Sequence, residues 1–441
     1  MTTPVSAELK PERLSLVDTA WLHMEQPTNL MMVGSLAFLD EPLERRQLLT
    51  ALSRRLLQHA RFRERIEASP VGPPHWAADP AFELEAHVHP MALPAPGGDA
   101  ELRDLLGDLM SRPLDMSRPL WDVHLIENHG SGSVMFTRIH HCIADGQALI
   151  GVLLGLTATT AAASLRTARA RSDRPPANGH RHLPSLDPRH AVAGLVELGA
   201  HAFTLARLSA LWPDSATPLR GTLTRSKHVA WTDPIALESL RPLRRETGCT
   251  VNDVLVAAVA GALRTYIRKH GDGEMPDHIR ALVPVDMRAG SVDGTLGNKF
   301  GLVFLDMPVG LARRRERLMA VHDRMDEARH SPQPSVALEV LGAMGLVPQA
   351  VQRQVVRFFG SKGTAVVTNV RGPAQQRFLA GRHLRSLTFF VPQSAMLAIG
   401  ISIMTYAGHI QMGVISDAGL VPDPTTIARD IAAELHGLTK N

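Results

Sequence analysis

The sequence predicts a mixed α/β protein of the α+β sandwich type, built from two lobes of comparable size. Its 441 residues are enough for two or three domains. Strand-like and helix-like patterns alternate on both sides of a basic, proline-interrupted segment. We therefore predict a first lobe over residues 1–165, a linker with an apolar helix over 166–225, and a second lobe over 226–441.

The first lobe is predicted from residues that alternate between apolar and polar types and from leucines at helical spacing. Leu48, Leu52 and Leu56 share one helical face, with arginines opposite. The predicted elements are strands at 30–40, 82–88, 121–126 and 133–138, helices at 43–59 and 102–110, and a Pro- and Gly-rich loop at 91–100.

The uncharged run from Gly146 to Leu165 is long enough to suggest a membrane span. It contains four Ser and Thr residues, however, so we predict a buried helix. The first residues, 1–6, have neither a basic region nor an apolar core, and no signal peptide is expected.

The linker at 166–190 carries six arginines and four prolines. This composition favours a solvated tether over a contact with a membrane or with a CoA phosphate. Residues 191–211 are largely apolar at helical spacing and are expected to dock on the protein body or on lipid.

The second lobe shows its clearest signal at Thr250, a good N-cap residue with Asp253 at the spacing of a capping box. The predicted strands are 228–231, 279–285, 302–309, 365–370 and a hairpin of 399–406 with 409–416; the predicted helices are 235–245, 250–269, 311–329 and 425–438, and residues 336–360 form an apolar stretch.

The amino-acid composition argues against several classes of function. The net charge is only +4, and aromatic residues make up 4% of the chain, so a nucleic-acid-binding surface is not expected. This mild basic bias suits an anionic cosubstrate or lipid surface. Two cysteines give no disulfide framework and no zinc spacing, and no phosphate-binding loop or metal cluster is visible.

The residues with the clearest chemical signal are His140 and His141, where the strand at 133–138 meets the helix that follows Gly146. Neighbouring side chains on a strand point to opposite faces, so one histidine should be packed and the other free to react. A neutral imidazole can take a proton from a hydroxyl at physiological pH.

The pattern H-H-x-x-x-D-G of residues 140–146 is joined by several other stretches. They are Leu16–Trp21, Arg118–Trp121, Thr250–Val254, Pro284–Arg288, Gly297–Asn298 and Thr368–Pro373. Together they resemble the bacterial wax ester synthase/diacylglycerol acyltransferase family, over nearly the whole chain. One departure is Arg371, where the family usually has proline.

The resemblance implies two chloramphenicol-acetyltransferase-like lobes with the active-site tunnel at their interface. It implies an O-acyltransferase that moves the acyl group of acyl-CoA, its cosubstrate, to a long-chain alcohol or diacylglycerol without a cofactor or metal. His141 would be the general base and His140 a supporting residue. A different hydroxyl acceptor (a sterol, a short alcohol or a glycolipid) or a silent lipid-surface protein stays an alternative.

The resemblance also assigns supporting roles. Asp145 would pair with Arg288 of the second lobe, and Gly146 would permit the tight turn into the helix. The expected substrate-binding residues are Asn252, Asp253, Pro119, Leu120, Trp121, Thr368 and Asn369, although capping, turn formation and core packing also account for them. Cys142 is expected to be a small buried thiol and not a nucleophile.

The expected partners are acyl-CoA, the lipid acceptor and the surface of a membrane or lipid droplet. The protein would be cytoplasmic, bound peripherally to the inner membrane face or to lipid inclusions, as a monomer or homodimer.

Overall fold

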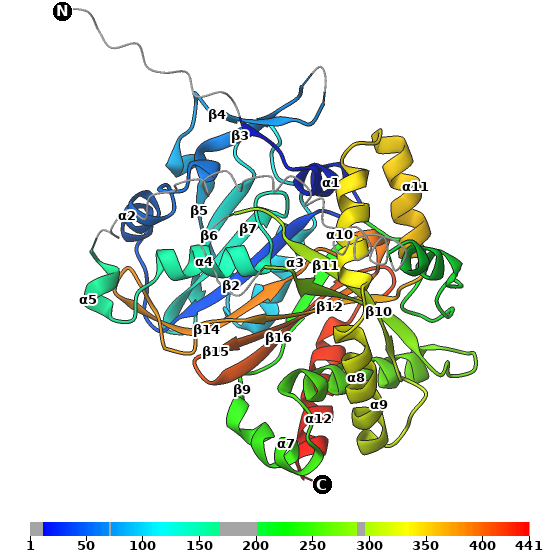
Figure 1. Ribbon diagram of the computed structural model, residues 1–441. Coiled ribbons are helices and arrows are strands. Elements are labelled where there is room, and N and C mark those ends of the chain that lie inside the picture. Colours follow the sequence, from blue (N-terminus) through cyan, green and yellow to red (C-terminus); the bar gives the residue numbers. More distant parts are fainter. Residues whose placement is uncertain (1–11, 70–71, 167–200, 289–295, 441) are drawn as a thin grey trace, which may run out of the picture.

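The computed structural model describes residues 12–69, 72–166, 201–288 and 296–440. Two large mixed sheets lie side by side near the centre of the molecule, and helices cover their outer faces (Figure 1). The predicted α+β class with two lobes is confirmed.

The first sheet has the strand order β13-β14-β2-β7-β6-β5. Its strands are β2 (Met32–Leu39), β5 (Val88–Ala92), β6 (Trp121–His129), β7 (Gly132–His140), β13 (Phe378–Leu379) and β14 (Arg382–Phe390). Its helices are α2 (Arg45–Arg55), α3 (Asp99–Met110), α4 (Gly146–Leu156) and α5 (Ala161–Ser164). β5 is parallel to β6, and the other pairs are antiparallel.

A small sheet, β1-β4-β3, caps this lobe beside helix α1 (Leu16–Met24). Its strands are β1 (Glu12–Arg13), β3 (Glu64–Glu67) and β4 (His75–Ala78), and the turn η1 (Ala60–Arg63) precedes β3.

The second sheet has the order β11-β10-β12-β15-β16-β8, with β9 paired to β16. Its strands are β8 (Lys227–Trp231), β9 (Ile235–Ala236), β10 (Ile279–Asp286), β11 (Phe300–Met307), β12 (Ala365–Arg371), β15 (Ile399–Tyr406) and β16 (His409–Asp417). Its helices are α7 (Arg241–Thr247), α8 (Val251–His270), α9 (Arg314–Arg329), α10 (Gln333–Met344), α11 (Gln349–Gly360) and α12 (Pro424–Lys440), with short turns η3 (Leu237–Leu240) and η4 (Ser394–Met396). Residues 201–210 are also helical.

Strand β14 was not predicted from the sequence. Its position changes which parts of the chain build each lobe. It lies beyond residue 226 in the chain, yet it pairs with β2 of the first sheet, for example Leu387 with Ala37. A division of the chain at residue 226 therefore does not coincide with the division between the sheets. The C-terminal half of the chain completes the sheet of the first lobe.

Two local predictions were wrong. The strand predicted at 82–88 is mostly the turn η2 (Leu84–His87), and the strand follows this turn as β5, which overlaps the predicted loop at 91–100 only in its last two residues. The run 146–165 forms two helices, α4 and α5, because Thr157 ends the first with its backbone N–H still bonded to Leu153. Residues 336–360, for which only an apolar stretch was predicted, are divided between α10 and α11, with Pro348 as the N-cap of α11.

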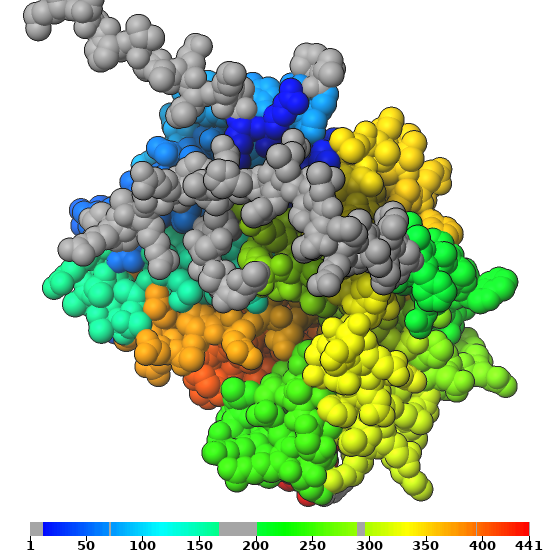
Figure 2. All heavy atoms as spheres, in the orientation of Figure 1, coloured from blue at the N-terminus to red at the C-terminus, as the bar shows by residue number. Residues whose placement is uncertain are grey.

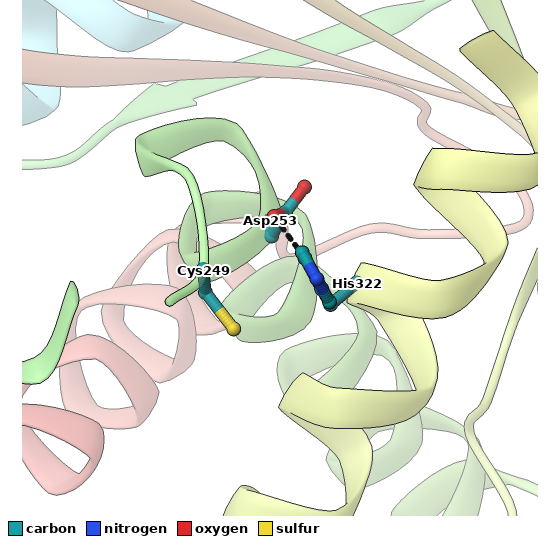
Figure 3. A group of neighbouring side chains, drawn as sticks. All are labelled: Cys249, Asp253 and His322. Carbon is teal, nitrogen blue, oxygen red and sulfur yellow. Dashed lines mark hydrogen bonds and ion pairs between the residues drawn. The ribbon is translucent and has the colours of Figure 1, made fainter. Parts of the chain in front are cut away.

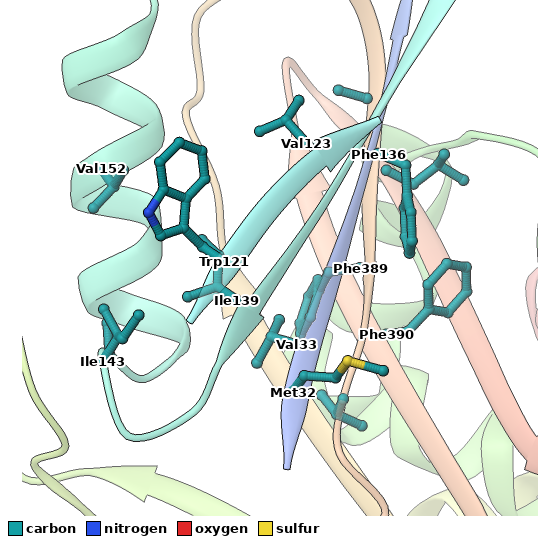
Figure 4. Close-up of a cluster of buried hydrophobic side chains, with 14 of the residues drawn as sticks. Met32, Val33, Trp121, Val123, Phe136, Ile139, Ile143, Val152, Phe389 and Phe390 are labelled. Carbon is teal, nitrogen blue, oxygen red and sulfur yellow. The ribbon is translucent and has the colours of Figure 1, made fainter. Parts of the chain in front are cut away.

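The core of the first lobe lies between the two sheets and under α4. Trp121, Phe136, Phe389 and Phe390 contribute to it from β6, β7 and β14 (Figure 4). A second core surrounds α8, which is buried along most of its length. Among the described helices, none combines the length and the apolar character that a bilayer crossing requires.

Candidate functional site

His141 follows the last residue of β7, at the junction of the two lobes. Its backbone N–H donates to the carbonyl of Met31, 2.7 Å away, which holds the turn against the start of β2. Its side chain lines a cavity of about 730 Å³, part of which is open to solvent. The opposite wall comes from β10, β11 and β12 of the second lobe.

The His141 ring lies between aromatic side chains. Trp21 of α1 stacks on it, with 4.1 Å between ring centroids and 16° between ring planes, and Phe300 lies 5.7 Å away. Burial lowers the pKa of His141 to about 4, although nearby Asp145 acts in the opposite direction. The imidazole is therefore neutral at pH 7. Its Nδ1 is buried and has no hydrogen-bond partner.

His140 has a different environment, as the alternation along β7 predicts. Its side chain is fully buried. Its Nδ1 accepts a hydrogen bond from the backbone N–H of Cys142 at 3.1 Å, and its Nε2 lies 2.9 Å from the Glu25 carboxylate. His140 thus faces the protein interior, and Glu25 is a neighbour that the sequence did not suggest.

Asp145 and Arg288 are brought together, as expected. Arg288 Nη2 lies 2.7 Å from Asp145 Oδ2 and also donates to the carbonyl of Gly297. Asp145 Oδ1 accepts from the backbone N–H of Ala148 and caps α4. One carboxylate therefore fixes both the start of α4 and the contact with the second lobe.

Gly146 does not serve the turn in the expected way, since its φ lies outside the left-handed region. Glycine is favoured at position 146 because a neighbouring side chain leaves little room for a Cβ atom. A Cβ at this position would lie 3.0 Å from Cγ2 of Val370 on β12. The left-handed residue is Gly297, at φ 105°, whose N–H donates to the carbonyl of Ile143.

Asn298 links three segments at the site. Its side-chain amide donates to the carbonyl of His141 and to Oδ1 of Asp18, each at 2.7 Å. Burial raises the pKa of Asp18, and the hydrogen bonds from Asn298 oppose that rise. Asp18, Trp21 and Asn298 all belong to stretches noted in the sequence, but a contact between segments about 280 residues apart leaves no local pattern.

Thr368 and Asn369 line the His141 cavity from β12. The Asn369 side chain donates to Oδ1 of Asn252, 3.0 Å away, so Asn252 is adjacent to this wall. Asp253 is fully buried away from the cavity, where it caps α8 in the predicted capping box with Thr250. Arg371 ends β12 and is exposed.

Three expected substrate-binding residues do not line this cavity. Leu120 and Trp121 are buried in the first core, and Trp121 donates its indole N–H to the carbonyl of Phe62 and stacks on His87. Pro119 precedes them and accepts from the backbone N–H of Trp121. Leu120 and Trp121 thus pack in the first core, and none of the three residues is among those that line the His141 cavity.

Cys142 is buried, as expected. Burial raises the pKa of its thiol well above the usual value, and the carboxylates of Asp18 and Glu25 act in the same direction. A thiol held in its protonated form is a poor nucleophile.

A second cavity, of about 680 Å³, adjoins the first. Its lining is almost wholly apolar and comes from α1, α10, α11, β10, β11 and the helix at 201–210. Trp21 and Leu302 line both cavities. His141 thus lies beside a large apolar space.

Comparison with known proteins identifies the family. Residues 14–255 match the wax ester synthase/diacylglycerol acyltransferase catalytic domain, and residues 296–439 match the C-terminal domain of the same enzymes. The chain belongs to the wax ester synthase/diacylglycerol acyltransferase family. It is an O-acyltransferase.

Relatives agree with this assignment. A Mycobacterium tuberculosis protein named as a probable diacylglycerol O-acyltransferase is 29% identical over 97% of this chain and 96% of its own length. The wax ester synthase/diacylglycerol acyltransferase of Marinobacter aquaeolei superposes with a TM-score of 0.73 at 23% identity, over 97% of this chain and 99% of that one. A starter condensation domain of rhizomide synthetase, solved with C8-CoA and Leu-SNAC, has the same fold at a TM-score of 0.62 and 12% identity, over 98% of this chain and 94% of that domain.

Proposed function

We propose that this acyltransferase transfers the acyl group of a long-chain acyl-CoA to the hydroxyl of a long-chain alcohol or diacylglycerol, with His141 as general base. The observation that carries the proposal is a neutral imidazole in a cavity that adjoins an apolar one. The same fold in a condensation domain solved with C8-CoA supports a CoA thioester as donor.

The chemistry needs one base and no redox step. The acceptor oxygen attacks the thioester carbon while Nε2 of His141 takes the hydroxyl proton. The tetrahedral intermediate then collapses, the C–S bond breaks, and the imidazolium returns the proton to the departing sulfur. The products are an ester and free CoA. A pKa depressed by burial keeps the imidazole uncharged before attack.

The other residues hold this arrangement. Trp21 fixes the plane of the His141 ring by stacking, and Asn298 holds its backbone carbonyl. Asp145 and Arg288 fix the loop between the histidines and α4. Thr368 and Asn369 offer a hydroxyl and an amide to substrate on the facing wall, and Asn252 orients Asn369. The apolar cavity would receive a hydrocarbon chain.

The test uses purified protein with palmitoyl-CoA and either hexadecanol or dioleoylglycerol, and follows release of the CoA thiol together with the ester product. His141→Ala should lower kcat by about 10²–10⁴-fold, the usual contribution of a placed base. His409→Gln, at an exposed position on β16, is the matched control and should keep full activity. Undiminished thiol release by His141→Ala would refute the assigned base.

We also propose that a lipid-facing patch brings the enzyme to its substrates. The patch consists of Phe203, Trp212, Leu346, Val351 and Phe358, all exposed, with Phe203 at 70% and Trp212 at 83%. The helix at 201–210 and α11 are neighbours, since both line the apolar cavity, and Figure 2 shows them on one side of the molecule. Exposed Arg207, Arg353 and Arg357 lie on the same two helices.

An apolar patch with arginines around it suits an anionic lipid surface. Flotation with vesicles that contain anionic phospholipid tests this. The double variant Trp212→Glu/Phe358→Glu should lose vesicle binding, while Met116→Glu, which changes an exposed methionine of the first lobe, should retain it. Equal flotation of both variants would count against the patch.

A further inference from the structure

A second group of chemically reactive side chains lies between the start of α8 and the middle of α9 (Figure 3). Cys249 precedes α8, Asp253 lies in its first turn, and His322 faces them from α9. The sulfur, one carboxylate oxygen and one imidazole nitrogen all lie within 4.8 Å of one another. The residues that line the His141 cavity do not include these three.

Asp253 has a buried oxygen that lacks a hydrogen bond. Its Oδ2 accepts from the backbone N–H of Thr250 and pairs with Nδ1 of His322, each at 2.8 Å. Its Oδ1 is buried and has no hydrogen-bond donor. The nearest cation, Nη2 of Arg329, is 3.7 Å away, beyond hydrogen-bond distance, on a side chain that is 47% exposed. Oδ2 is therefore the oxygen that faces His322 and would bind a metal.

The three donors are of the types that bind zinc. Thiolate, imidazole and carboxylate are its common protein ligands, whereas Ca²⁺ and Mg²⁺ prefer oxygen ligands alone. Met319, one turn before His322 on α9, brings a thioether to 4.0 Å from the Cys249 sulfur. We propose that Cys249, Asp253 and His322 form a Zn²⁺ site.

The site needs only a small adjustment of the side chains. Zn–S bonds of about 2.3 Å and Zn–N or Zn–O bonds of about 2.0 Å, arranged as a tetrahedron, place ligand atoms roughly 3.3–3.5 Å apart. His322 Nδ1 and Asp253 Oδ2, now 2.8 Å apart, would move apart by about 0.5 Å, and the Cys249 sulfur would move inward. Its thiol proton passes to solvent when the thiolate binds the metal.

Zinc here would join α8 to α9 near the enzyme's substrate cavity. Asp253 is adjacent to Asn252, whose side chain holds Asn369 on the cavity wall. The metal would therefore stabilise the end of α8 that supports this wall, without contact with the reacting atoms. The proposal does not depend on which substrate the enzyme uses.

The experiment titrates the full-length, metal-stripped protein with Zn²⁺ against a chromophoric chelator and repeats the titration with Co²⁺. We expect one equivalent of zinc, a thiolate-to-cobalt charge-transfer band in the near ultraviolet, and a higher Tm with zinc. Cys249→Ser and His322→Gln should each weaken zinc binding by more than about 100-fold. Mutation of a residue that only hydrogen-bonds to a metal ligand lowers metal affinity by about 10–100-fold, and loss of a ligand itself should cost more.

Two controls isolate the site. Cys142→Ser removes the other cysteine, and His330→Gln changes an exposed histidine at the end of α9; both should keep the stoichiometry and the cobalt band. The proposal is overturned if the native chain shows no saturable binding, or if Cys249→Ser keeps the band. If Cys249→Ser or His322→Gln unfolds, the cobalt titration of the native protein still tests the site. A native protein without the charge-transfer band would contradict the proposal.

Discussion

A histidine that serves as a base must be uncharged when substrate arrives, and its surroundings decide the pH at which this holds. His141 lies under Trp21 and beside Phe300, where water solvates the imidazolium poorly. Burial accordingly lowers its pKa to about 4. The exposed histidines on the surface have no such environment.

This difference predicts the pH dependence of the enzyme. Protonation of His141, the proposed base, would stop the reaction, and a lowered pKa moves that loss of activity to lower pH. We expect kcat/KM to stay constant from pH 8 down to about pH 6 and to decline only toward the pKa of about 4. A pH–rate profile, with circular dichroism to confirm folding at each pH, checks this. A half-maximal rate near pH 6.5 would show an ordinary, solvated histidine.

For single residues, the sequence predicted the environments of His140 and His141 better than it predicted which distant residues contact them. Alternation along β7 correctly separated buried His140 from His141 at the cavity, because period two is a local property. Trp21 and Asn298 contact His141 from segments that are distant in the sequence, and no rule of residue spacing predicts such contacts. The same reason hides the proposed zinc ligands, since Asp253 and His322 are 69 residues apart.

Between elements, the contact of greatest consequence joins the loop before α4 to the end of β10. Arg288 bonds Asp145, Asp286 and the carbonyl of Gly297, and the side chains of Arg288 and Asp145 are both more than 90% buried. The motif aspartate is thus held by the second lobe, and the pairing predicted from the family resemblance lies at 2.7 Å.

Arg288→Ala should therefore lower the free energy of unfolding by about 3–5 kcal/mol, because it leaves the Asp145 carboxylate buried without its cation. Urea denaturation of the purified proteins measures this. Arg385→Ala, which changes an exposed arginine on β14, is the control and should stay within about 0.5 kcal/mol of the native chain. Equal stability of both variants would show that the ion pair contributes little.

Element boundaries show where sequence patterns are reliable. Helix α8 was predicted closely, because Thr250 and Asp253 form the capping box that their spacing indicates. The strand at 82–88 was misplaced, because the order of its residue types alternates as in a strand while the backbone forms a 3₁₀ turn. Strand β14 was missed, since its arginines at 382 and 385 interrupt the apolar pattern on the exposed side.

At the scale of the whole molecule, the two lobes are interdependent. The first sheet needs β14 from the C-terminal half, and the His141 cavity needs walls from both halves. Without β14, the edge of β2 would expose its unpaired backbone groups.

We therefore predict that a fragment of residues 1–225 does not fold alone. Expressed by itself, it should be insoluble or should bind a hydrophobic dye and lack a cooperative thermal transition, whereas the full chain unfolds cooperatively. Size-exclusion chromatography and calorimetry measure this. A soluble, cooperatively unfolding fragment would mean that the first lobe closes its sheet without β14.

The pairing of β2 with β14 also sets a constraint during synthesis. From Leu39 to Phe390 the ribosome must add 351 residues (390 minus 39), which takes roughly 20–70 s at about 5–20 residues per second. Throughout that time the nascent chain holds one strand whose neighbour does not yet exist. We therefore expect the yield of folded enzyme to depend on how well this strand edge is protected during synthesis, and on the speed of translation beyond residue 226.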